Sequence, residues 1–66
     1  MKIHYDSKDD AVYIELAKGK YDVSREISDS VVVDEDKNGK VLGIEILDAS
    51  DNIPSFDPKK ISFQAT

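Results

Sequence analysis

The chain has no cysteine, one histidine, two prolines and only three glycines among its 66 residues. Without cysteine the fold cannot contain a disulfide, and a zinc site built from a cysteine-rich or histidine-rich ligand set is excluded. The glycines stand apart as Gly19, Gly39 and Gly43, so no glycine-rich loop is present to cradle a phosphate group. These absences exclude several common classes of enzyme and metal protein, and we expect no cofactor.

Long apolar runs and excess positive charge are also missing. No apolar segment approaches the ~20 residues that a membrane-spanning helix requires, and the first six residues turn polar too early for a secretory signal. Nine basic residues against fourteen acidic ones give a net charge of −5, which disfavours binding to phosphate backbones and to anionic membranes. We therefore expect a cytoplasmic protein that binds neither nucleic acid nor membranes and that could attract a basic protein partner.

The length of the chain limits its core. Residues 1–66 form a single domain, and a chain this short buries only about 60% of the surface that it exposes when unfolded. The side chains expected to face the core are large and apolar, and include Ile3, Val12, Ile14, Leu16, Val31, Val33, Leu42, Ile44, Ile46, Ile61 and Phe63. Because this core is small, we expect a partner surface to complete it, and we predict a homodimer.

Apolar and polar residues alternate with a period of two through most of the chain, which is typical of half-buried β-strands. The alternating segments are residues 2–5, 11–17, 21–27 and 41–47, a β-branched run occupies 31–33, and a last short strand is predicted at 60–65. The last strand would pair within the chain or across a dimer. Tyr21, Val23 and Ile27 are expected on one side of their strand.

Turn and helix signals complete the predicted fold. Asn38-Gly39 favours a hairpin, because this pair readily adopts positive φ values. Residues 48–53 can form one helical turn, with Asp48 or Ser50 as N-cap, and Pro54 should end it. The sequence thus predicts a mainly β fold of the α+β type: a single antiparallel sheet, mainly a meander of about five strands, with one short helix near the C-terminus.

Residues 34–45 match the calcium-loop pattern D-x-[DN]-x-[DN]-G-x5-E through Asp34, Asp36, Asn38, Gly39 and Glu45. A calcium-binding EF-hand needs a helix on each side of this loop, whereas strand-like sequence flanks it here. In an extended strand Glu45 would lie roughly 20 Å beyond Gly39 and could not return to the ion. We interpret the segment as a hairpin; the alternative is a weak surface calcium site made by Asp34, Asp36 and Asn38 without Glu45.

Two other groups of polar residues could carry chemistry. Asp6, Asp9 and Asp10 cluster in a turn and could form an acid pair or a metal site, although a solvated turn is the simpler interpretation. His4 could act as a general base only beside a nucleophile or substrate, and the sequence places neither there. No catalytic or metal-binding residue is therefore assigned.

One strand face suggests a surface for binding. Tyr13, Glu15 and Glu45 lie on strand faces opposite the apolar ones, and Gly43 shares that position. A glycine within a strand marks a bulge or a close approach to the backbone. We take Tyr13, Glu15 and Glu45 as a candidate interaction surface; the alternative is an ordinary solvated face.

Four blocks of sequence resemble a small bacterial family known only as domain of unknown function family 2283. They are Tyr5-Asp6, the run 10–16, the run 32–39 and the run 43–50, which is the most specific. The resemblance covers roughly residues 3–50, and Ser28-Asp29-Ser30 departs from the glycine-containing turn usual before the third block. It implies a compact β-rich bacterial protein and brings no established activity, cofactor or catalytic residue. Some members resemble the partner half of toxin–antitoxin gene pairs.

Two classes of function remain open from the sequence. The first is a non-enzymatic protein-interaction module, which would be a self-assembling dimer or an antitoxin-like acidic partner of a basic protein. The second is a small metal-binding or hydrolytic domain that uses its aspartates. We favour the first, because the acids fall mainly in turns and no nucleophile lies near a base.

Overall fold

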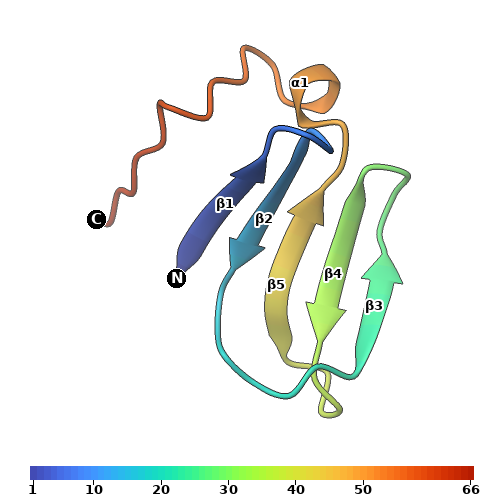
Figure 1. Ribbon diagram of the computed structural model, residues 1–66. Helices are drawn as coiled ribbons and strands as arrows, with labels where there is room; N and C mark the ends of the chain where they lie inside the picture. The colour runs from blue at the N-terminus through green and yellow to red at the C-terminus, as the bar shows by residue number, and fades with distance from the viewer.

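The computed structural model describes residues 1–66 and contains five antiparallel strands in one sheet and one short helix (Figure 1). The elements are β1 (Lys2–Asp6), β2 (Ala11–Glu15), β3 (Val23–Glu26), β4 (Val31–Glu35), β5 (Val41–Ile46) and α1 (Ala49–Asn52). The predicted fold class, a mainly β protein with about five antiparallel strands and a C-terminal helical turn, is confirmed. The helix is neither long nor apolar enough to cross a membrane.

The strands lie in the order β1-β2-β5-β4-β3. Hairpins join β3 to β4 and β4 to β5, so these three strands form a meander as predicted. After β2 the chain does not turn back on itself; residues 16–22 cross to the far edge of the sheet and enter β3 there (Figure 1). Strand β5 therefore lies between β2 and β4, and strands β2 to β5 form a Greek key.

The strand register separates two faces of different chemistry. One face carries aligned apolar side chains from four strands, and we call it the apolar face: Ile3, Tyr5, Val12, Ile14, Val31, Val33, Ile44 and Ile46. The other carries Tyr13, Glu15, Asp34 and Glu45, and we call it the acidic face. Because side chains alternate along each strand, this separation follows directly from the period of two in the sequence.

A β-bulge changes the position of one predicted core residue. Gly43 pairs with Asp34 and Val41 pairs with Glu35, so Leu42 has no partner across the ladder. Leu42 is buried, as predicted, but its side chain packs against Gly19 and lines a hollow with Tyr13 on the acidic face. The prediction that it faces the same way as Ile44 and Ile46 is wrong, because a bulge interrupts the alternation of sides.

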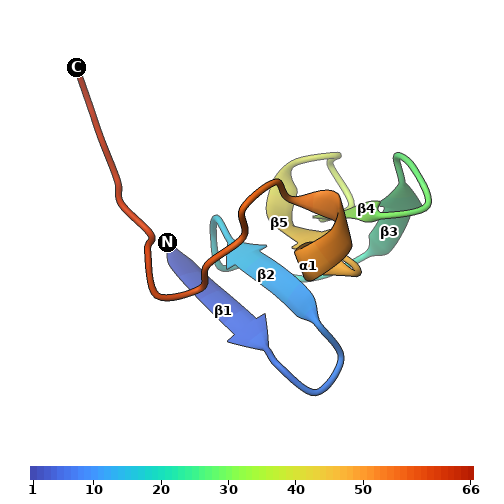
Figure 2. The same ribbon diagram turned by 90° about the horizontal axis from the view of Figure 1, so that it is seen from above.

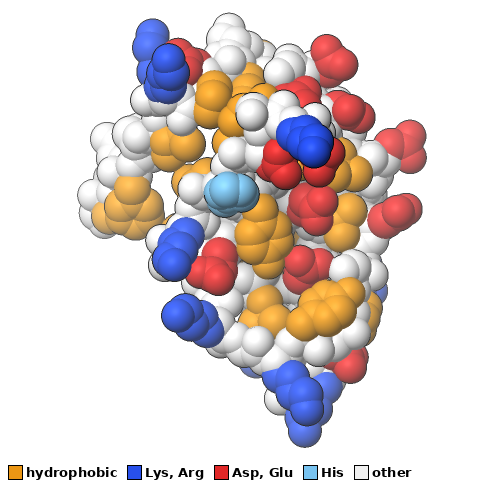
Figure 3. Space-filling view, viewed as in Figure 1, with side chains coloured by type: hydrophobic (Ala, Val, Ile, Leu, Met, Phe, Trp, Pro, Cys, Tyr) orange, Lys and Arg blue, Asp and Glu red, His pale blue; other side chains and the backbone are white.

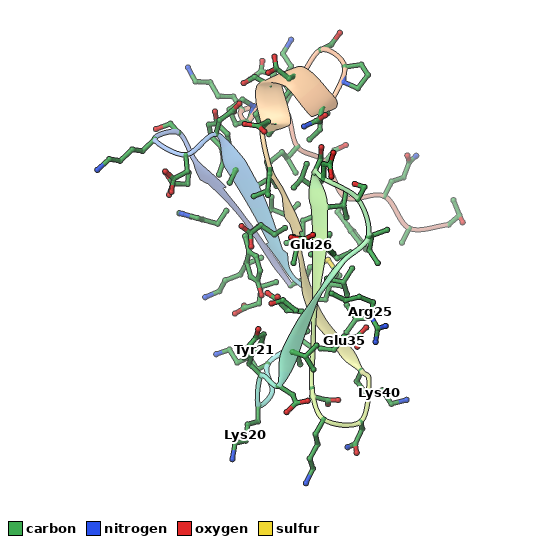
Figure 4. The ribbon with its side chains drawn as sticks, turned by 90° about the vertical axis from the view of Figure 1, so that its right-hand side faces the viewer. Lys20, Tyr21, Arg25, Glu26, Glu35 and Lys40 are labelled. Atoms are coloured by element: carbon green, nitrogen blue, oxygen red, sulfur yellow. The ribbon has the colours of Figure 1, made fainter.

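Strand β3 is shorter than the alternation predicts. It begins at Val23, so Tyr21 lies in the preceding connection. Tyr21 and Arg25 lie on opposite sides of the sheet (Figure 4), whereas Arg25 and Val23 share a face because they are two residues apart in one strand. The prediction that Tyr21 lies on the same side as Val23 is wrong, because the chain adopts strand geometry only after Tyr21.

The last predicted strand, at residues 60–65, does not form. This segment has no strand pairing and lies beyond the β1 edge of the sheet without joining it (Figure 1). Ile61 and Phe63, both expected in the core, are 51% and 82% exposed. Alternation gives a segment an apolar side, but it supplies no neighbouring strand to receive the backbone hydrogen bonds.

Candidate functional site

The structure brings the three predicted surface residues together. Tyr13 pairs with Glu45 across the β2–β5 ladder, and Glu15 is opposite Gly43 on the same ladder. Asp34 of β4 is opposite Gly43 on its other side, so a third carboxylate joins the group. All four polar side chains are half-buried. Figure 3 shows this side of the molecule, where acidic side chains gather around hydrophobic ones near the middle of the face.

Gly43 explains why the ring of Tyr13 can lie across strand β5. A Cβ atom at Gly43 would lie 2.6 Å from Cζ of Tyr13 and 3.0 Å from the carbonyl oxygen of Ile14. The first separation is shorter than any normal contact, so only glycine leaves room for the phenol. The close approach anticipated for Gly43 is therefore made by a side chain of the same chain.

A hollow of about 370 Å³ lies beside Tyr13. Residues from β2, β4, β5 and the β2–β3 connection line it: Tyr13, Glu15, Ala17, Lys18, Gly19, Tyr21, Asp34 and Leu42. Tyr21 and Asp34 are joined through Ser24, whose Oγ lies 2.7 Å from the Tyr21 hydroxyl and donates to Oδ1 of Asp34 at 2.7 Å. The sequence did not place Tyr21 and Asp34 at this surface, because the long connection and the bulge that bring them there leave no local pattern.

The protonation of Tyr13 suits a neutral hydrogen-bonding group. Burial raises the pKa of the Tyr13 phenol, and the charges of Asp34, Glu15 and Glu45 raise it further. Tyr13 thus remains an uncharged donor and an aromatic surface at neutral pH, while the carboxylates around it supply the negative charge. Such a surface can bind a cation through carboxylate hydrogen bonds and through the ring face.

A second polar cluster has a structural role. The Asp10 carboxylate accepts hydrogen bonds from the Tyr5 hydroxyl at 2.9 Å, the Ser50 hydroxyl at 2.8 Å and the Ser50 amide at 3.1 Å. The hydrogen bonds from Ser50 and Tyr5 lower the pKa of Asp10. Asp48 precedes α1 as predicted, but its side chain makes no capping hydrogen bond. The carboxylate of Asp10, from a distant turn, instead accepts the free backbone amide of Ser50 in the first turn of the helix.

The calcium-loop pattern belongs to a β-hairpin. Strands β4 and β5 flank it, and Gly39 has the positive φ of +78° that the turn requires. Oδ1 of Asp36 accepts the amides of Asn38 and Lys40 at 2.8 and 2.9 Å, so the turn itself uses this oxygen. No group of three or more His, Cys, Asp or Glu residues is arranged to hold a metal ion.

Calcium should therefore leave the stability of the protein unchanged. A ligand that binds the folded state stabilises it appreciably only when its concentration is near or above its dissociation constant. The test uses 1–5 mM CaCl₂, which is on the order of the dissociation constants of the weakest calcium-binding modules or above them. We expect it to shift the melting temperature by less than about 1 °C, measured by circular dichroism with MgCl₂ as the control. A rise of many degrees that Asp34→Ala abolishes would contradict the hairpin interpretation.

A family model described as "Protein of unknown function (DUF2283)" matches residues 2–50, which include all five strands. The chain belongs to the DUF2283 family. The match confirms the resemblance seen in the sequence. The matched residues include those of the acidic face and of the Asp10 cluster. The C-terminal segment after residue 50 lies outside the matched region.

The chain is similar to an uncharacterised protein of the archaeon Methanocaldococcus jannaschii. It is 42% identical over 71 aligned positions, which cover 98% of this chain and 59% of the relative. The chain thus spans about three fifths of the length of this relative. The resemblance seen in the sequence implied a bacterial protein, whereas this relative comes from an archaeon. Proteins similar to this DUF2283 chain are therefore not confined to bacteria. No solved structure matches.

Proposed function

We propose that the chain is a non-enzymatic protein-binding module whose acidic face receives a basic segment of another protein, as an antitoxin-like partner of a basic protein would. The observation that carries the proposal is the grouping of Tyr13, Glu15, Asp34 and Glu45 on one face of the sheet. A sheet holds these groups at fixed spacing, so little conformational freedom is lost when a partner binds.

The chemistry of the acidic face favours arginine or lysine side chains. Half-buried carboxylates form stronger charge-assisted hydrogen bonds than fully solvated ones. A guanidinium group can also stack on an aromatic ring while it pairs with a carboxylate, and Tyr13 and Tyr21 both line the hollow beside Glu15 and Asp34. A hollow of about 370 Å³ is large enough for one or two such side chains.

The charge of the whole chain supports rapid association with a basic protein. A net charge of −5 on 66 residues attracts a positively charged partner over distances of about 8–10 Å at physiological salt. Steering of this kind raises association rates by about 10- to 1,000-fold at low ionic strength. Both the sign and the location of the charge therefore fit a basic partner at the acidic face.

Charge reversal on the acidic face should slow association with such a partner. We expect the double variant Glu15→Lys, Glu45→Lys to reduce the association rate by about tenfold or more at low salt, because it changes the potential at the docking site. The partner is first captured from the native cell on the wild-type chain, and rates are then measured by surface plasmon resonance between 25 and 300 mM NaCl. Circular dichroism verifies that the variant is folded.

A matched control separates local from global charge. Asp9→Lys with Asp29→Lys makes the same change in net charge in two turns, and it should slow association far less. Equal slowing by both double variants would contradict the assignment of this face. Failure to capture any stoichiometric basic protein would contradict the proposal itself, as would turnover of a substrate that Asp→Ala changes abolish.

A further inference from the structure

The apolar face is only partly covered within one chain. The segment 53–61 crosses it beside β1 and β2, where Phe56 packs against Tyr5 with ring centroids 5.1 Å apart. Figure 2 shows this segment on one side of the sheet, beside β1 and β2, with nothing over β3 and β4. On the uncovered half, Val31 and Val33 are only half-buried and Val23 is 40% exposed.

The isolated chain exposes more surface than a compact monomer of the same mass. The chain exposes 5352 Å², whereas a folded monomer of 7.4 kDa exposes about 4,200 Å². The radius of gyration, 12.5 Å, also exceeds the about 11 Å of a compact domain of this length. The uncovered part of the apolar face and the exposed C-terminal segment both contribute to this excess of about 1,100 Å². A standard interface buries ~800 Å² on each partner, so the excess leaves room for one.

The distribution of charge identifies what can cover the apolar face. The strand residues of its uncovered half include two charged side chains, Arg25 and Glu35, which neutralise each other in an ion pair of 3.0 Å. Figure 4 shows both on the side of the sheet opposite Tyr21. A basic protein would be drawn to the acidic face, so electrostatics does not direct it here. A second copy of the chain can approach this face with its own Glu15, Asp34 and Glu45 pointing away.

We propose that the uncovered half of the apolar face, on β3, β4 and β5, is a dimerisation surface that packs against the same surface of a second copy. The two sheets then form a two-layer sandwich about 10 Å apart, with an isologous two-fold interface. Val33 and Ile44, which are paired on β4 and β5, lie near the centre of this interface. Both acidic faces remain on the outside of the dimer, so each stays open to a basic partner.

Adjacent valines of one strand provide a matched test. Val33 lies on the apolar face and Val32, opposite Glu45, on the acidic face. Sedimentation equilibrium of the wild type at 10–500 μM should give twice 7.4 kDa. Val33→Lys should weaken the dimer at least tenfold, because it buries an unpaired charge in the interface, whereas Val32→Lys should leave it intact.

Two further variants test the same interface if Val33→Lys fails to fold. Val23→Lys changes a side chain that is 40% exposed at the rim of the same surface, so it should weaken the dimer without removing core packing. Removal of residues 61–66 should leave the dimer in place. The proposal is overturned if the wild type is monomeric at 500 μM, or if folded Val32→Lys and Val33→Lys weaken the dimer equally. It is also overturned if folded Val23→Lys dimerises as tightly as the wild type, or if removal of residues 61–66 is the only change that abolishes the dimer.

Discussion

Replacement of Gly43 by alanine is expected to lower the melting temperature by roughly 5–20 °C. The new methyl group would meet Cζ of Tyr13 at 2.6 Å and the Ile14 carbonyl oxygen at 3.0 Å, so the tyrosine ring must leave its position over β5. Overpacking of this kind costs about 1–3 kcal/mol. Thermal and urea unfolding followed by circular dichroism would measure the loss.

A double-mutant cycle assigns that loss to the tyrosine. In the Tyr13→Ala background the collision with the ring is absent, so Gly43→Ala should lose at least half of its effect on the free energy of unfolding. An unchanged effect would show that the strain arises at the Ile14 carbonyl oxygen instead. The cycle also tests whether the acidic face depends on Gly43, because Tyr13 occupies its centre.

Removal of the Asp10 side chain should lower the melting temperature by roughly 4–8 °C, the effect of losing a helix cap in a domain of this size. Asp10→Gly is the informative variant, because the residue has a φ of +52° that glycine adopts without strain. The variant loses the acceptor for the Tyr5 hydroxyl and for both donors of Ser50. Differential scanning calorimetry at pH 7 would measure the change.

Asp10 should also give stability a defined dependence on pH. Hydrogen bonds from Ser50 and Tyr5 lower its pKa below the ordinary 3.8, so the folded state favours the ionised carboxylate. The resulting stabilisation is complete above pH 3.8 and disappears as the pH falls through the lowered pKa. Asp10→Asn retains an acceptor oxygen but does not titrate, so its stability should fall less steeply between pH 4 and pH 2. Identical slopes for the two proteins would contradict this role.

Local patterns predicted much of the sheet. Strand β2 was expected over 11–17 and is found over Ala11–Glu15, and β5 was expected over 41–47 and is found over Val41–Ile46. The Asn38-Gly39 hairpin and the helical turn after Asp48 were also located correctly. Each of these features depends on residues close together in the chain, through side-chain alternation, turn conformations or a short stretch of helix.

Features that depend on distant contacts were missed or misplaced. The cap of α1 comes from Asp10, which is 40 residues from Ser50, and nothing near the helix indicates it. Leu42 changes faces because of an irregular pairing between β4 and β5. Residues 60–65 alternate like a strand but find no edge within the chain, since alternation is a property of the segment and pairing is a property of its neighbours.

The sequence by itself determined that this chain forms antiparallel strands with one polar and one apolar face, because a period of two places alternate side chains on opposite sides of any sheet. It also placed Tyr13, Glu15 and Glu45 on the polar side. Only the tertiary structure decided that these three residues, with Asp34, form one surface. That grouping requires β5 to lie between β2 and β4. The crossing of residues 16–22 to the far edge of the sheet produces this order, and the order is fixed by packing between distant strands rather than by any local signal.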